Sequence, residues 1–342
     1  MRTPASFCIA AITGLSCLTA AQAQSDAVAD FYAGKSITLI VSTGAGGGMD
    51  ANARLVARHM GKHVPGKPTI VVRNMPGAGH IQATNFMHTQ APKDGSHIAA
   101  ILPSFVLYQM IDGRGAQYDT RNFNWLGSSD VDNMNVYVWH AAPVKTIEDA
   151  KRTEILMGGT GAGSYTVLFP TLMNALLGTK FKIVAGYKST NEIHLAMERG
   201  EVQGRAGNFF SSLKSQNADW LRDGKITLIA QVGEERDPEF PHVPLLQDMT
   251  TDAEAKQIFR LFSAEIAMGK AYLTTPDTPK DRLDALRRAF DATMQDAGFM
   301  TEAKASTIEV RPIKADAVSR VANEILATPK ALVERAAQVR GK

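Results

Sequence analysis

The sequence is poor in cysteine, and the little it has lies at one end. Only Cys8 and Cys17 occur among 342 residues. The chain after Cys17 therefore has no thiol that could supply a disulfide, a nucleophile or a metal ligand. This excludes cysteine-based catalysis and cysteine zinc sites for nearly the whole chain. A fold of this length must then be held together by its hydrophobic core.

Blocks of like charge and long apolar runs are also missing beyond the N-terminus. The chain has 37 Lys and Arg against 34 Asp and Glu, for a net charge of +3. The basic residues are spread out, which argues against a nucleic-acid partner. No later segment approaches the roughly 20 apolar residues that cross a bilayer. A hydrophobic content of 44% and a charged content of 21% fit a soluble protein of two ordinary domains.

The N-terminal segment is typical of a secretory signal. Arg2 precedes an apolar stretch that ends in the small-x-small sequence Ala21-Gln22-Ala23. We interpret residues 1–23 as a signal peptide, rather than as a buried helix, and expect a periplasmic protein. Gly14 stands where a lipoprotein signal needs Leu ahead of Cys17, so a lipid anchor is not expected.

Strand-like and helix-like runs alternate after the signal, which predicts an α/β fold with parallel strands. The first set of expected strands is “SITLIV” (36–41), “TIVV” (69–72) and “HIAAIL” (97–102). The second set is “VYVW” (136–139), “ILMGG” (155–159), “FKIVAGY” (181–187), “EVQGRAG” (201–207) and “KITLIAQVG” (225–233). Thr146 is expected to cap a short helix in this second half. Two similar lobes are therefore predicted.

Each half carries one glycine-rich turn between a strand and a helix. These turns are “STGAGGGMD” (42–50), where Asp50 could cap the helix, and “GGTGAGSYT” (158–166). Glycine lets the backbone approach a ligand, and a helix N-terminus offers free N–H donors and partial positive charge. Such turns bind phosphate or carboxylate equally well. Two of them facing each other would form a site that closes on an anion.

The nucleotide motifs fail in both turns. The G-x-G-x-x-G pattern ends on Met49 when started at Gly44, and on Ser164 when started at Gly159. The segment 61–68 fits a phosphate loop only until Pro68, which replaces the Ser or Thr that binds magnesium. The anion is therefore not expected to be a nucleotide, and no cofactor is predicted.

Catalytic and metal sites are not predicted either. His59 and His63 are four residues apart on an expected helix, but near its C-terminus they suit the helix dipole better than a metal. Ser164 after a glycine turn could be a nucleophile, yet no histidine is marked as its base. We expect its hydroxyl to cap the helix instead.

Six segments, in order, resemble one known family. They are “ITLIVSTGAGGGMDANARLVARHM”, “VVRNMPGAG”, “APKDGSHI”, “GGTGAGSYT”, “AGYKSTNEIHLAMERGEVQG” and “FPHVPLLQDM”. The chain is similar to the substrate-binding proteins of tripartite tricarboxylate transporters, the TctC or Bug family. The resemblance implies a type 2 periplasmic-binding fold with two crossing strands as its hinge. One lobe would comprise residues 24–129 and 234–342, and the other residues 130–233.

The resemblance also implies a function. The protein would be a monomer that binds a small organic acid, often through waters, and delivers it to a membrane permease without ATP. An exported receptor for a sensor protein, or an exported enzyme on the same fold, are the alternatives. The positions that match the family's ligand loops are Thr43, Gly44, Ala45, Gly46, Gly47, Gly48, Thr160, Gly161, Gly163, Ser164 and Tyr165, with Asn208 matching an Asn of the family's F-D-N segment.

The departures from the family pattern indicate a more negative or more apolar ligand. Met49 stands in place of a Thr, Gly207 in place of an Asp, and Gln203 in place of an acid. Arg205 has the same strand parity as Gly207, so we expect it to face the cleft and pair with a carboxylate. The alternative for Arg205 is a surface salt bridge.

Overall fold

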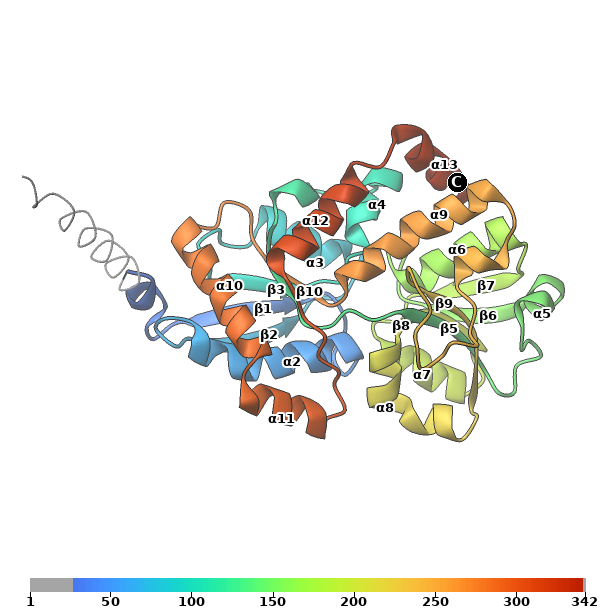
Figure 1. Ribbon diagram of the computed structural model, residues 1–342, viewed down its shortest axis with the longest axis horizontal. Helices are drawn as coiled ribbons and strands as arrows, with labels where there is room; N and C mark the ends of the chain where they lie inside the picture. The colour runs from blue at the N-terminus through green and yellow to red at the C-terminus, as the bar shows by residue number, and fades with distance from the viewer. Residues whose placement is uncertain (1–26, 341–342) are drawn as a thin grey trace, which may run out of the picture.

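The computed structural model describes residues 27–340, so the expected signal peptide lies outside the described residues. Two sheets, one of six strands and one of five, lie side by side with helices packed on both (Figure 1). We call the unit around the six-stranded sheet the first lobe and the unit around the five-stranded sheet the second lobe. This is the α/β two-sheet periplasmic-binding fold expected from the sequence.

The first sheet is mixed, with strand order β11-β4-β10-β3-β1-β2. β1 pairs in parallel with both β2 and β3, while β10 runs antiparallel to β3 and β4. Its strands are β1 (Ser36–Val41), β2 (Thr69–Asn74), β3 (His97–Ala100), β4 (Asn124–Ser128), β10 (Ala271–Thr274) and β11 (Ile313–Lys314). Buried apolar and β-branched residues dominate β1, as expected for an inner parallel strand.

The second sheet has the order β7-β6-β8-β5-β9. β6 pairs in parallel with β7 and β8, and β5 runs antiparallel to its neighbours β8 and β9. Its strands are β5 (Met134–Trp139), β6 (Ile155–Gly159), β7 (Phe181–Ala185), β8 (Gly204–Phe209) and β9 (Ile226–Val232). Every strand predicted from the apolar runs is therefore present, with small shifts at the ends.

The helices fill the connections between strands. They are α2 (Gly48–Met60), α3 (Ile81–Thr89), α4 (Phe105–Ile111), α5 (Ile147–Arg152), α6 (Tyr165–Leu177), α7 (Thr190–Glu198), α8 (Phe210–Arg222), α9 (Ala253–Ala264), α10 (Lys280–Met294), α11 (Ala297–Ala305), α12 (Ala315–Leu326) and α13 (Lys330–Arg340). No helix within residues 27–340 is long and apolar enough to span a membrane.

The helix starts confirm one capping prediction and correct two. Thr146 caps α5, because its hydroxyl accepts from the N–H of Asp149. The Asp149 side chain in turn accepts from the N–H of Thr146, which completes a capping box. Asp50 does not cap α2, because the helix begins earlier, at Gly48; its carboxylate accepts from the N–H of Gly46 instead. Ser164 sits at the cap position of α6, but its hydroxyl donates to the carbonyl of Gly161 at 2.7 Å.

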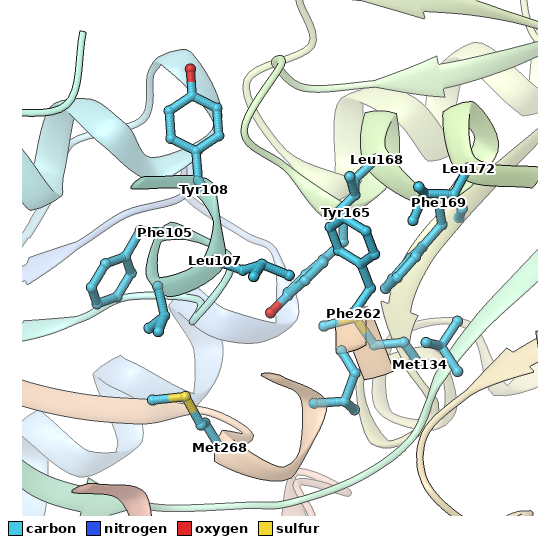
Figure 2. Close-up of a cluster of buried hydrophobic side chains, with 14 of the residues drawn as sticks. Phe105, Leu107, Tyr108, Met134, Tyr165, Leu168, Phe169, Leu172, Phe262 and Met268 are labelled. Atoms are coloured by element: carbon cyan, nitrogen blue, oxygen red, sulfur yellow. The ribbon is translucent and has the colours of Figure 1, made fainter. Parts of the chain in front are cut away.

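A continuous apolar core joins helices from both halves of the chain. Figure 2 shows its centre, where Leu107 of α4 and Phe262 of α9 lie near residues of α6 such as Phe169. Tyr165 stacks on Phe169 with ring centroids 5.3 Å apart. Although α9 follows β9 in the sequence, it lies beside α6 (Figure 1).

A buried ion network lies where the chain passes from β4 to β5. Asp130, which is fully buried, is 2.8 Å from Lys270 Nζ and 3.1 Å from Arg311 Nε. Its carboxylate also accepts from the hydroxyl of Ser211 on α8. Burial by itself would raise the pKa of Asp130, but Lys270 and Arg311 outweigh it and hold that pKa below its ordinary value. The network ties the crossing segment to both lobes.

Candidate functional site

A cavity of about 340 Å³ lies between the two lobes. The segments that line it follow β1, β2 and β3 in the first lobe and β6 and β7 in the second, and β8 contributes its own end. These are the carboxyl ends of parallel strands, where ligands bind in open α/β sheets. The cavity is therefore where the fold itself favours a binding site.

The structure brings many of the predicted site residues to this cavity and leaves others outside. The predicted residues that line it are Thr43, Gly47, Gly48, Thr160, Ser164, Tyr165, Arg205 and Asn208. The predicted residues that lie outside its lining are Gly44, Ala45, Gly46, Gly161 and Gly163. Met49, which the sequence marks as a departure, is buried and lines the cavity as well.

The middle of the first glycine turn contacts the second lobe. Gly44 N–H donates to the carbonyl oxygen of Lys188 at 3.0 Å. The carbonyl of Gly46 accepts from Asn191 Nδ2 at 2.9 Å and from Gln216 Nε2 at 2.8 Å. These backbone groups are thus occupied by protein partners across the cleft, and the turn lines the cavity on either side of them, at residues 42–43 and 47–49.

The second glycine turn makes a similar contact with the first lobe. A Cβ placed on Gly161 would lie 2.7 Å from the nitrogen of Gly79, and one on Gly163 would lie 2.9 Å from its oxygen. These glycines therefore permit close approach of two backbones. The parts of this turn that line the cavity are Thr160 before these glycines and residues 164–166 after them.

Two further loops line the cavity and were not predicted as site residues. They are residues 76–80, which follow β2, and residues 186–190, which follow β7. Both loops could have been identified because each follows a predicted parallel strand, and such loops lie at the same edge of the sheet. The “PGAG” stretch at 76–79 was noted only as a family motif.

Arg205 is a buried cation in the cavity wall, with 2% of its surface exposed. This excludes the surface salt bridge considered for it. Its guanidinium lies 3.5 Å from His194 Nε2 and 3.5 Å from the carbonyl oxygen of Gly207, and its Nε has no partner among residues 27–340. Burial without a carboxylate lowers the pKa of Arg205. A guanidinium held this way favours an anion that enters the cavity.

Arg205 reaches the cavity through a bulge in β8. Arg205 pairs with Tyr137 and Asn208 pairs with Asn135, so two residue steps on β5 face three on β8. The bulge, where Gly207 has φ +66°, places the Arg205 and Asn208 side chains on the same face. The bulge interrupts the regular alternation from which Arg205 and Gly207 were expected to share a face, and both residues line the cavity.

Among the described residues that line this wall, Arg205 is the only buried side chain that carries a charge. His194 Nε2 lies 2.7 Å from the hydroxyl of Tyr137, and burial together with the charge of Arg205 lowers the pKa of His194 to about 2. The imidazole is therefore neutral at physiological pH. Asn208 Nδ2 and Thr43 Oγ1 are buried donors without protein partners in the described chain. The cavity lining contains no Asp or Glu.

The surroundings of Gly207 leave no room for the Asp that the family pattern has at this position. A Cβ on Gly207 would lie 2.5 Å from the Cβ of Tyr165. The Tyr165 ring extends from α6 toward Leu107 of α4, as Figure 2 shows. The space that a carboxylate side chain would need at residue 207 is therefore filled by Tyr165.

The arrangement provides donors for an anion and no assembled catalytic group. Ser164 Oγ bonds to Gly161 O and to Thr166 Oγ1, and within residues 27–340 it makes no hydrogen bond to a histidine. His59 Nε2 is hydrogen-bonded to Glu302 Oε2 at 2.7 Å on the first lobe. Within residues 27–340 no cluster of three His, Cys, Asp or Glu side chains could hold a metal ion.

Solved structures with this fold include a periplasmic binding protein and two proteins with bound organic acids. The periplasmic binding protein BugD matches with a TM-score of 0.72 and 20% identity, over 89% of this chain and 98% of that chain. An R. palustris protein solved with adipate matches at 0.69 and 19%, covering 90% and 98%. MatC from Rhodopseudomonas palustris, with bound malate, matches at 0.68 and 18%, covering 88% and 99%.

Sequence comparison agrees with the fold. A Cupriavidus necator protein, described as “UPF0065 protein in gbd 5'region”, is 28% identical over 248 residues, which is 70% of this chain and 72% of that protein. The family model described as “Tripartite tricarboxylate transporter family receptor” matches residues 52–337. This is a family of binding receptors rather than enzymes, and the chain belongs to it.

Proposed function

We propose that this protein captures a small organic acid between its two lobes and delivers it to the membrane subunits of a tripartite tricarboxylate transporter. The observation that carries the proposal is Arg205, a buried guanidinium without an acidic partner, in the wall of a cavity that has no acidic lining residue. A carboxylate that paired with it would satisfy two of its donors at once.

The predicted ligand contacts that line the cavity supply further donors. Thr43 and Asn208 each present a buried donor that lacks a protein partner. The N-termini of α2 and α6 meet the cavity at Gly48 and Tyr165, and both add partial positive charge. The relatives solved with adipate and malate hold acids of this kind. We therefore expect a carboxylate to bridge the lobes.

Ligand binding should close the lobes, because an anion that contacts both stabilises only the closed arrangement. We propose that the moving units are residues 24–129 with 234–342, and residues 130–233. The ion network at Asp130 lies at one crossing between them. We propose that the expected N-terminal signal directs the protein to the periplasm, where the membrane permease would receive the ligand.

The test is a binding screen with the protein cut after Ala23. Calorimetry against mono-, di-, tricarboxylates and aromatic acids should find at least one tight ligand, while NAD and ATP should not bind. Solution scattering with that ligand should show a smaller radius of gyration. Tight nucleotide binding without any carboxylate response would contradict the proposal, as would turnover of the bound acid.

Delivery to a permease needs its own test. Uptake of the identified acid by cells should be lost when the gene is deleted and restored by the wild-type chain. Normal uptake combined with loss of a transcriptional response to the acid would instead favour the sensor-linked alternative.

A further inference from the structure

His80 is a buried histidine in the cavity wall that none of the predicted contacts includes. It is 6% exposed and lines the cavity at the start of α3. Its Nδ1 lies 3.2 Å from the carbonyl oxygen of Ser42, at the end of β1. The ring is therefore fixed in orientation by the first lobe.

The backbone around His80 is strained. Gly77, Ala78, Gly79 and His80 have φ of +151°, +47°, +64° and +84°. Positive φ is costly for Ala and His, since their Cβ atoms crowd the backbone. Strain of this kind persists only where the surrounding structure holds it, and it concentrates at ligand clamps. The loop thus keeps the His80 imidazole at the cavity, although glycine would adopt this backbone conformation at a lower energetic cost.

The hydrogen bond to Ser42 determines which ring nitrogen carries the proton. A carbonyl oxygen can only accept, so Nδ1 must be the donor. Burial lowers the pKa of His80 to about 4, which leaves the ring neutral at physiological pH. Nε2 then carries a lone pair, and it has no protein partner among residues 27–340. His80 therefore offers the cavity a fixed acceptor.

This acceptor differs in kind from the donors at Arg205 and Asn208, whereas the unpartnered hydroxyl of Thr43 can donate or accept. Arg205 and the amide nitrogen of Asn208 can only donate, and both suit a carboxylate. We propose that His80 Nε2 accepts a hydrogen bond from the ligand, so that the site selects an organic acid that also carries a hydroxyl or N–H group. This rests on the proposed function and specifies its substrate class.

Matched pairs of acids test the inference. Calorimetry should compare succinate with malate, propionate with lactate, and benzoate with 4-hydroxybenzoate, which differ by one hydroxyl. The wild-type protein should prefer the hydroxyl-bearing member of at least one pair by about tenfold, the order of one hydrogen bond. His80→Gly relieves the backbone strain and removes the acceptor, so it should reduce that preference to within about twofold.

Two more variants make the result specific. His80→Asn keeps an acceptor and tolerates positive φ, so it should recover part of the preference. Lys67→Gly is the control, because Lys67 also has positive φ, at +50°, but lies outside the cavity lining. It should keep the wild-type preference.

The outcomes separate this inference from the proposed function. Acids that bind without a hydroxyl preference, or a preference that survives in His80→Gly, would overturn the role of His80 and leave the proposed function intact. Equal weakening of both members of a pair would show a merely structural role and also overturn it. If no acid in the screen binds, the proposed function itself is contradicted, and the inference about His80 is overturned with it.

Discussion

The N–H of Gly44, in the first lobe, donates to the carbonyl oxygen of Lys188, in the second lobe, at 3.0 Å. The bond crosses the cleft beside the cavity and uses backbone atoms only. A side chain at residue 44 would interfere with it, since a Cβ there would lie 2.7 Å from the same oxygen. The contact therefore depends on glycine because of the opposite lobe, and not because of the turn's own backbone angles.

Gly44→Ala should weaken acid binding by at least tenfold. Its methyl group meets Lys188 only when the lobes are together, and such overpacking costs about 1–3 kcal/mol. Calorimetry measures the affinity, and scattering should show less compaction at saturating ligand. Gly298→Ala in α11 is the control and should bind normally. If Gly44→Ala closes and binds like the wild type, the contact has no part in closure.

Arg205→Met should separate stability from binding. The unliganded protein should melt at the same or a higher temperature, because a buried cation without a partner is replaced by an apolar side chain. Acid binding should weaken by roughly 30-fold or more, since loss of a buried charged partner costs about 2–5 kcal/mol. Arg205→Lys should recover only part of the affinity, because it lacks the paired donors.

The matched control for Arg205→Met is Arg199→Met on the exposed end of α7, which should change neither property. An affinity of Arg205→Met within threefold of the wild type would remove Arg205 from the site. The backbone turns, Thr43 and Asn208 would then be the remaining donors.

Lys270→Met should destabilise the protein by about 3 kcal/mol. Asp130 is fully buried, and removal of one partner leaves its charge poorly compensated even with Arg311 in place. Asp130→Asn combined with Lys270→Met should restore part of the loss. Urea unfolding at pH 7 measures both. A loss below about 1 kcal/mol for the single variant would mean that the buried pair contributes little.

The same network has an expected acid dependence. The pKa of Asp130 is held below its ordinary value, so its contribution is present above the unfolded carboxyl pKa and is lost as pH falls through the folded pKa. The wild type should therefore lose more stability in acid than the double variant does.

Glu265→Gln should stabilise the protein at pH 8 more than at pH 5. Glu265 is fully buried; its Oε1 accepts from Leu107 N–H at 2.7 Å, and burial raises its pKa to about 8. Between the unfolded carboxyl pKa and pH 8 the folded state binds more protons, so wild-type stability falls as pH rises. Gln cannot ionise, and the difference should grow by on the order of 3 kcal/mol.

Denaturant unfolding at both pH values checks the Glu265 prediction. Glu148→Gln, an exposed substitution on α5, should follow the wild type at each pH. A Glu265→Gln advantage that does not change with pH would show that the carboxyl titrates normally in the folded protein.

The sequence by itself determined the strands, the two glycine turns and the family. Apolar β-branched runs such as 36–41 favour buried strands, and glycine between strand and helix marks where a backbone anion site can form. Six motifs, in the order in which the family has them, identified the family. The broken patterns at Met49 and Ser164 were enough to set nucleotides aside, because each lacks the glycine that the fingerprint needs.

Only the tertiary structure decided which of those residues line the cavity. Gly44 and Gly46 contact the second lobe, a fact that depends on how two distant segments meet. The bulge at Gly207 turned Arg205 and Asn208 to one face, and strand parity cannot reveal an inserted residue. The isolation of Arg205 from any acid, the acceptor on His80 and the buried carboxyl of Glu265 depend on neighbours far apart in the chain, which a linear pattern does not contain.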